Sequence, residues 1–66
     1  MTDKLTIREL EVAKLVTDGV PGKEIAKELG LSYFTVKMYK QIIFIKMDVH
    51  NSVQLTAKLF RAGLIK

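Results

Sequence analysis

Three glycines divide this chain into segments of helical length, and their positions constrain its fold more than any other feature. Gly19, Gly30 and Gly63 each follow a run in which apolar residues recur at helical spacing. Glycine adopts the left-handed conformation that ends a helix at little energetic cost. The sequence therefore predicts an all-α fold of four helices joined by short connections.

The first helix is predicted to begin after Thr6 and to end at Gly19. Glu9 follows Thr6 by three residues, which is the capping-box spacing, in which each side chain satisfies a backbone amide near the other. A second helix over residues 23–29 follows the Pro21-Gly22 turn, and Gly30 ends it. The residues expected to point inward are Leu5, Val12, Leu15 and Val16 for the first helix and Ile25, Ala26 and Leu29 for the second.

Ser32 is expected to cap a third helix over residues 33–47, after a connection of the length used in helix-turn-helix motifs. At 100° per residue this helix has one side that faces the core and one that faces outward. The predicted core side is Val36, Tyr39, Ile43 and Met47, and the outer side is Phe34, Met38, Gln41 and Ile45, flanked by Lys37 and Ile42.

Asn51 or Ser52 can cap a fourth helix, which is predicted to end near Ala62 with Gly63 as its stop. This helix is apolar on two sides. One side is expected to cover the core and the other to contact a second surface, because a small monomer rarely leaves such a stripe in water. One stripe is Val53, Ala57, Phe60 and Leu64, and the other is Leu55, Leu59 and Ala62.

The length of 66 residues suits one domain, over residues 1–66, near the lower limit for folding without disulfides or metals. The chain has no cysteine, and the lone His50 cannot hold a metal by itself. Hydrophobic residues make up 48% of the sequence, so aliphatic packing can supply the core. We therefore expect neither a metal site nor a cofactor.

The sequence indicates neither a membrane protein nor an enzyme. No stretch approaches the roughly 18 apolar residues of a membrane span, and residues 1–4 do not begin a secretory signal, which favours the cytoplasm. The one histidine lies in a turn, and no glycine-rich phosphate loop is present. Glu9 and Glu11 lie two residues apart, so they do not face each other on a helix.

Charge is distributed unevenly along the chain. Residues 1–31 hold five basic and six acidic side chains, whereas residues 32–66 hold six basic side chains and Asp48 alone. A positive half beside a nearly neutral half suits a polyanion such as DNA. A solvated basic surface explains the same charge equally well, so charge alone does not decide between them.

Several segments, in order, resemble the LuxR/GerE-type (NarL-like) helix-turn-helix domain of bacterial transcription regulators. The resemblance covers nearly the whole chain, and it is specific because the full series keeps its spacing. The matching segments are Leu5-Thr6-x-Arg8-Glu9-x-Glu11-Val12, Gly19-Val20, Lys23-Glu24-Ile25-Ala26-x-Glu28-Leu29-Gly30-Leu31-Ser32, Thr35-Val36-Lys37 and Lys46-Met47-x-Val49.

This resemblance implies a DNA-binding transcription regulator whose third helix enters the major groove of double-stranded DNA and whose fourth helix forms a homodimer. By position, Lys37, Met38 and Gln41 match the base-facing residues of the family. Lysine can donate to guanine and glutamine can pair with adenine, whereas methionine can contact only apolar groups such as the thymine methyl. The residues expected at the DNA backbone are Lys23, Thr35, Tyr39 and Lys40, and those expected in the dimer interface are Leu55, Leu59 and Ala62.

The chain departs from the family pattern at three places. Tyr39 replaces the histidine usual after Thr-Val-Lys, and Gly22 stands where an asparagine often caps the second helix, although glycine is a tolerated cap. The third departure is apolar: Phe34, Ile42 and Ile45 lie where polar residues are usual. These residues favour an alternative function, a protein-interaction module that binds another transcription factor.

The chain begins a few residues before its first helix, with no receiver or ligand-binding domain ahead of it. In this respect it resembles the stand-alone members of the family typified by the spore-coat regulator GerE. A natural protein of this length is expected to be regulated by its abundance or by its partners, whereas for a part of a longer protein this expectation does not hold.

Overall fold

The computed structural model describes residues 5–65, and these residues form four helices and no strand. The helices are α1 (Ile7–Thr17), α2 (Gly22–Leu29), α3 (Tyr33–Met47) and α4 (Ser52–Arg61). The predicted all-α fold is confirmed. Residues 1–4, considered above for a signal sequence, and Lys66, counted in the basic half, lie outside the described residues.

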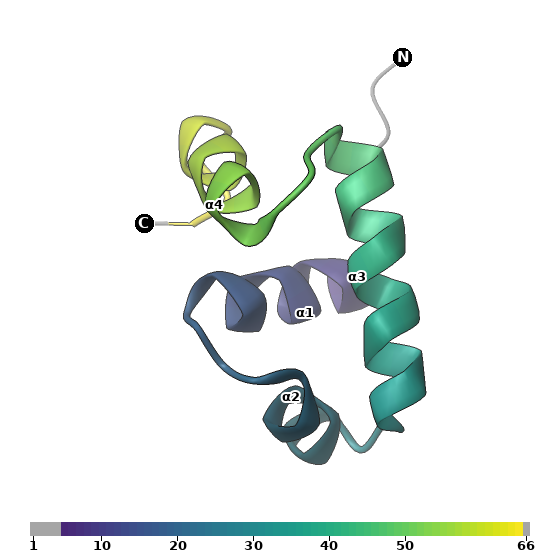
Figure 1. Ribbon diagram of the computed structural model, residues 1–66. Coiled ribbons are helices and arrows are strands. Elements are labelled where there is room, and N and C mark those ends of the chain that lie inside the picture. The colour runs from purple at the N-terminus through teal and green to yellow at the C-terminus, as the bar shows by residue number, and fades with distance from the viewer. Residues whose placement is uncertain (1–4, 66) are drawn as a thin grey trace.

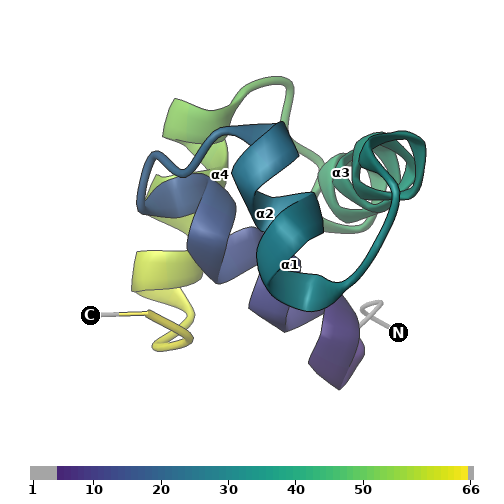
Figure 2. The ribbon, with the colours of Figure 1, turned by 90° about the horizontal axis from the view of Figure 1, so that it is seen from below.

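The four helices are arranged around α1, which lies between α2 and α4 (Figure 1). The long helix α3 runs along one side of the molecule, and a view from below shows it nearly end-on (Figure 2). It packs against both α1 and α2, while α4 packs mainly against α1. One side of α3 is therefore supported along its length, and the other is left to solvent.

Polar side chains begin three of the four helices as the sequence predicts. Thr6 and Glu9 form the reciprocal capping box of α1, and the Ser32 hydroxyl accepts a hydrogen bond from the backbone N–H of Thr35. Asn51, rather than Ser52, caps α4 by accepting from the N–H of Gln54 at 2.8 Å.

The second helix begins one residue earlier than predicted. Gly22 is its first helical residue and not its cap, because the extended backbone of Pro21 (φ −61°, ψ 149°) takes the cap position. The carbonyl of Pro21 accepts from the N–H groups of Glu24 and Ile25. The cap is thus made by backbone alone, with no side-chain hydrogen bond.

A residue with a positive φ follows every helix. Gly19, Gly30 and Gly63 take this conformation as predicted, and Asp48 takes it after α3 with φ 55° and ψ 53°. The next N–H then bonds back to the helix, as Val49 does to the carbonyl of Phe44 at 3.0 Å. Aspartate adopts this conformation with more strain than glycine. Its negative charge is also repelled by the negative, C-terminal end of the helix dipole.

We therefore expect Asp48→Asn to raise the free energy of unfolding by about 0.3–1 kcal/mol, since asparagine tolerates the left-handed region and carries no charge. Urea unfolding followed by circular dichroism measures this change. Asp18→Asn is the matched control, because Asp18 ends α1 in the ordinary right-handed conformation. An equal gain in both variants would show that charge alone, and not backbone conformation, is responsible.

The core is aliphatic and draws on every helix. The inward positions predicted for α1, α2 and α3 are confirmed, either as buried residues or as partly buried residues packed on the core. Ala13 and Val49 are buried as well and were not predicted. The buried hydrophobic residues are Val12, Ala13, Ile25, Ala26, Val36, Ile43, Val49, Leu55 and Leu59.

The two apolar sides of α4 are assigned differently from the prediction. Leu55 and Leu59, predicted in the dimer interface, have no exposed surface and pack in the core of their own chain. That assignment is wrong for both residues, because a fully buried side chain cannot contact a second molecule. Ala62 remains exposed. The stripe left open to solvent is the other one, formed by Val53, Ala57, Phe60 and Leu64.

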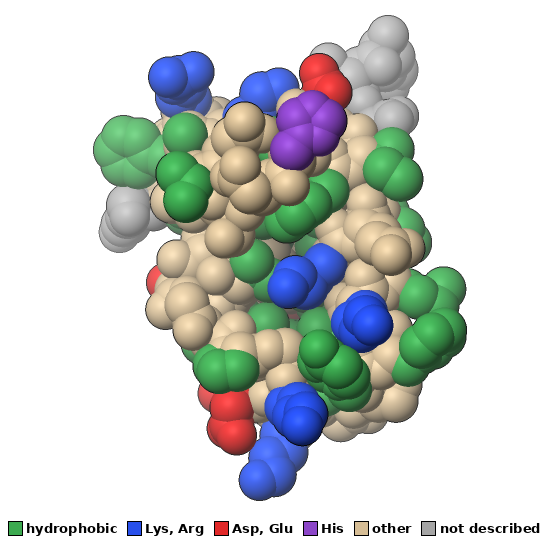
Figure 3. Space-filling view, viewed as in Figure 1, with side chains coloured by type: hydrophobic (Ala, Val, Ile, Leu, Met, Phe, Trp, Pro, Cys, Tyr) green, Lys and Arg blue, Asp and Glu red, His purple; other side chains and the backbone are tan. Residues whose placement is uncertain are grey.

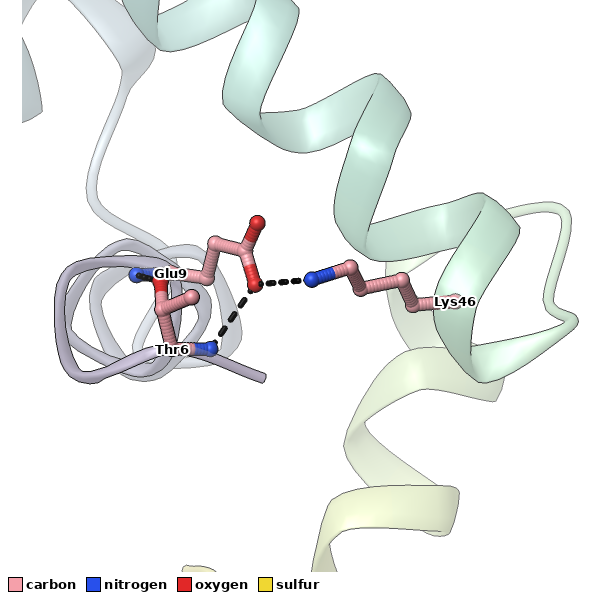
Figure 4. Close-up of polar contacts among 3 residues, drawn as sticks. All are labelled: Thr6, Glu9 and Lys46. Carbon is pink, nitrogen blue, oxygen red and sulfur yellow. Dashed lines mark hydrogen bonds and ion pairs between the residues drawn. The ribbon is translucent and has the colours of Figure 1, made fainter. Parts of the chain in front are cut away.

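An ion pair joins α1 to the last turn of α3 (Figure 4). The Lys46 ammonium donates to Oε1 of Glu9 at 2.9 Å, and the same oxygen accepts from the backbone N–H of Thr6 at 2.8 Å. These two contacts hold the pKa of the Glu9 carboxyl below its usual value, the Lys46 hydrogen bond having the larger effect. The capping box thus also fixes the position of α3.

No helix in the described part of the chain is long and apolar enough to cross a membrane.

Candidate nucleic-acid interface

The outward side of α3 carries the three residues predicted to contact bases. Lys37, Met38 and Gln41 are all exposed; Lys37 and Met38 are neighbours on one turn of the helix, and Gln41 lies on the next turn. Helix α2, the connection 30–32 and α3 form a helix-turn-helix pair, with α2 packed behind α3. The structure therefore presents these three side chains together on a supported helix.

Lysine side chains lie beside this row of residues. Figure 3 shows Lys and Arg side chains gathered on the face next to α3, with hydrophobic side chains along the outer edge of the helix. Lys23 is exposed in the first turn of α2, and Lys40 is partly buried. Lys40 lines a shallow hollow of about 380 Å³ with Gly22 and Ser52.

Two other lysines of the basic half bind within the chain instead. Lys46 pairs with Glu9, and the Lys58 ammonium donates to the backbone carbonyl of Met47 at 3.0 Å. These contacts link α3 to α1 and to α4. Part of the positive charge that the sequence places after residue 31 is therefore used in the fold, and Lys37 and Lys40 carry the charge of α3 that lies outside the Glu9 pair.

Thr35 and Tyr39, two of the residues predicted at the DNA backbone, are each held in place by the chain. The Thr35 hydroxyl lies 2.9 Å from the Ser32 hydroxyl at the start of α3. Tyr39 is partly buried and packs against the core, as the sequence predicts. Both side chains are thus held by contacts within the chain.

The predicted apolar edge of α3 is present in the structure. Phe34 is 70% exposed, Ile45 is 78% exposed and Ile42 is 37% exposed. Met38 and Ile42 line a shallow hollow of about 270 Å³ with Thr35 and Tyr39. This edge lies on the same helix as the predicted base-contacting residues. A molecule that binds those residues therefore also lies close to the apolar edge.

The sequence reasoning missed one residue next to this site, Tyr33. The Lys37 ammonium lies 5.7 Å from the centre of the Tyr33 ring, within the range of a cation–π interaction. The i, i+4 spacing of these residues on a helix was the signal that could have found the pair. The ring also lies against Gly22 of α2, which no sequence spacing reveals.

The described residues contain no group of three or more histidine, aspartate or glutamate side chains placed to hold a metal ion. Every buried side-chain nitrogen or oxygen in this part of the chain has a hydrogen-bond partner. In this part of the chain the polar groups available to a ligand are therefore those on the surface.

Comparison with known proteins identifies the family of the chain. The sequence profile described as bacterial regulatory proteins, luxR family, matches residues 3–59. The chain is 43% identical over 58 residues to the transcriptional regulatory protein UhpA of Escherichia coli, covering 88% of this chain and 30% of UhpA. It is 40% identical over 62 residues to the transcriptional regulatory protein DesR of Bacillus subtilis, covering 94% of this chain and 31% of DesR.

A third relative is the uncharacterized response regulatory protein YgeK of Escherichia coli, 40% identical over 62 residues, with 94% of this chain and 42% of YgeK covered. The chain thus spans less than half the length of each of these relatives. The family match extends from before α1 into α4 and includes the whole helix-turn-helix pair. The chain belongs to the luxR family of bacterial regulatory proteins.

Proposed function

We propose that this chain binds double-stranded DNA by placing α3 in the major groove, and that it thereby regulates transcription. The observation that carries the proposal is the row of exposed Lys37, Met38 and Gln41 on one side of a helix that is supported on its other side. An α-helix fits the major groove, where the base pairs are distinguishable. Bacterial DNA lies in the cytoplasm, which is where we place the protein.

In this proposal Lys37 donates to guanine, Gln41 pairs with adenine and Met38 contacts a thymine methyl. The backbone of the DNA is contacted by Lys23, Thr35, Tyr39 and Lys40. Lys23 and Thr35 lie in the first turns of α2 and α3, where the positive end of the helix dipole favours a phosphate. These contacts fix the position of α3 on the DNA without reading its sequence.

We further propose that the chain forms a homodimer through the exposed stripe of α4. Val53 is 79% exposed and Phe60 is 62% exposed, and the exposed Ala57 lies between them on the same side of the helix. A two-fold axis at this stripe presents two copies of α3 to two half-sites of an operator. This stripe takes the place of Leu55 and Leu59, which were predicted from the sequence to form the dimer interface and are buried in the core.

Selection of bound DNA from a random pool tests the function directly. The selected DNA is then titrated with protein at several salt concentrations. Because lysines displace counterions from phosphates, log K is expected to fall linearly with log salt, with a slope of about −0.9 per phosphate neutralised. Failure to enrich any sequence, or an affinity that does not change with salt, would contradict the proposal.

Lys37→Ala is expected to weaken binding to the selected DNA by about 1–3 kcal/mol and to relax the preference at one base pair. The reason is the loss of a donor to a base edge. Lys14→Ala is the matched control, since it removes the same charge from α1 and leaves α3 unchanged. Equal losses in the two variants would show that Lys37 contributes only general charge.

A second candidate function is favoured by the apolar edge of α3, formed by Phe34, Ile42 and Ile45. In this alternative the chain is an interaction module that binds another transcription factor. The two candidates predict different effects of the same two substitutions. A heterocomplex with such a factor that forms with Lys37→Ala and is lost with Ile45→Glu supports the interaction module. DNA binding that is lost in Lys37→Ala and kept in Ile45→Glu supports the first proposal.

A further inference from the structure

The ring of Tyr33 lies between the first turn of α2 and a base-contacting candidate on α3. On one side, a Cβ atom added to Gly22 would lie 2.8 Å from Cε1 and 3.4 Å from Cδ1 of the ring. On the other side, the Lys37 ammonium lies 5.7 Å from the ring centre. Tyr33 thus connects the two helices of the helix-turn-helix pair next to Lys37.

The close approach to α2 depends on glycine at position 22. A distance of 2.8 Å is shorter than real Cβ contacts, so any side chain at this position would displace the ring. Gly22 is not needed for an unusual backbone conformation, because it lies in the first turn of α2 and has no positive φ. The absence of a side chain at Gly22 therefore provides the space that the Tyr33 ring occupies.

The same contact restrains the lysine. A free lysine side chain populates many rotamers, and ordering it on binding costs conformational entropy. An aromatic face within about 6 Å attracts the ammonium and favours the rotamers that keep it there. A side chain ordered before binding loses less entropy when DNA arrives, which raises affinity.

We propose that Tyr33 is a positioning residue for Lys37: held against Gly22, its ring restrains the Lys37 ammonium before DNA binds. This inference rests on the proposed DNA-binding function. Tyr33 is 48% exposed, so its ring is not needed to fill the core, and it makes both contacts through ring atoms and not through its hydroxyl. The positioning of Lys37 therefore depends on the aromatic ring of Tyr33 and not on its hydroxyl.

A double-mutant cycle on DNA affinity tests the proposal. Tyr33→Leu is expected to weaken binding about two- to fivefold in the presence of Lys37, which corresponds to an exposed cation–π contact, and to have no effect in the Lys37→Ala background. Tyr33→Phe keeps the ring and is expected to bind as the wild type does. An equal effect of Tyr33→Leu with and without Lys37 would overturn the proposal.

Gly22→Ala provides a variant that keeps both partners and moves only the ring. The added methyl group is expected to displace Tyr33 and to reduce affinity by the same factor as Tyr33→Leu, while the unfolding midpoint stays near that of the wild type. Displacement of the ring is the easier response, because Tyr33 is a surface side chain. Undiminished affinity in Gly22→Ala would contradict the role of the ring position.

A measurement without DNA separates this inference from the proposed function. In proton NMR, the ring current of Tyr33 is expected to shift the side-chain protons of Lys37 upfield in the wild type and in Tyr33→Phe. In Tyr33→Leu and Gly22→Ala the protons should return toward the values of a free lysine. If the wild type binds no DNA, the proposed function fails, and these shifts still decide whether Tyr33 orders Lys37.

Discussion

Replacing Leu59 by alanine is expected to lower the free energy of unfolding by about 2–5 kcal/mol, the range for a leucine truncated in a packed core. Leu59 has no exposed surface, and α4 covers α1 with this side of the helix. A single hydrophobic core in a chain of this length rarely contributes more than about 3–5 kcal/mol of stability. The variant is therefore expected to be partly or wholly unfolded at room temperature, as urea titration followed by circular dichroism would show.

The neighbouring residue provides the control. Phe60 is 62% exposed, and Phe60→Ala is expected to change the stability of the monomer by no more than about 0.5 kcal/mol. If the exposed stripe of α4 forms a homodimer, Phe60→Ala should instead raise the protein concentration at which the dimer forms, as measured by analytical ultracentrifugation. A Leu59→Ala chain that stays fully folded and is merely monomeric would contradict the core assignment.

The second large effect is expected at Glu9, which is buried although it is charged. Glu9→Ala removes both the capping hydrogen bond and the partner of Lys46. A cap contributes about 0.5–2 kcal/mol and a hydrogen bond to a charged group about 1.5–3 kcal/mol, so we expect a loss of about 2–4 kcal/mol. Glu9→Gln is the control, because glutamine can serve as the third residue of a capping box without the charge.

The pH dependence of stability gives the sign of this contribution. The pKa of Glu9 is lower in the folded chain than its ordinary value, so the carboxylate stabilises the fold above the pKa of the unfolded chain, about 4.3. This stabilisation is lost as the pH falls through the folded pKa. The urea midpoint should therefore decrease from about pH 4.5 downward. The decrease should be smaller in Glu9→Gln, and equal decreases would show that other carboxylates cause it.

The helix termini were predictable because they depend on residues close in the sequence. Thr6 and Glu9 are three residues apart, and the capping box they form is found as predicted. Gly19, Gly30 and Gly63 end their helices because glycine adopts a positive φ without strain. The start of α2 was placed one residue late, since the carbonyl of Pro21 makes the cap and backbone hydrogen bonds leave no side-chain signal.

The exposed candidates on α3 were predictable for a related reason. Helical periodicity alone places Met38 and Gln41 on the side opposite Val36 and Ile43, with Lys37 beside them, and the structure keeps that division. Periodicity did not show that Lys46 and Lys58 bind within the chain. Their partners, Glu9 and the carbonyl of Met47, lie 37 and 11 residues away in the sequence, and only folding brings them within hydrogen-bond distance.

The sequence alone determined that α4 has two apolar stripes, because periodicity shows which side chains share a side of a helix. It did not determine which stripe faces the core, since both are rich in aliphatic residues. In the tertiary structure Leu55 and Leu59 face the core, because the orientation in which α4 packs on α1 turns these residues inward and leaves Val53 and Phe60 in solvent. The same holds for Tyr33, whose contact with Gly22 exists only because α2 and α3 cross at that point. Local chemistry thus sets where helices begin and end, and the packing between helices decides which of their surfaces remain free to bind.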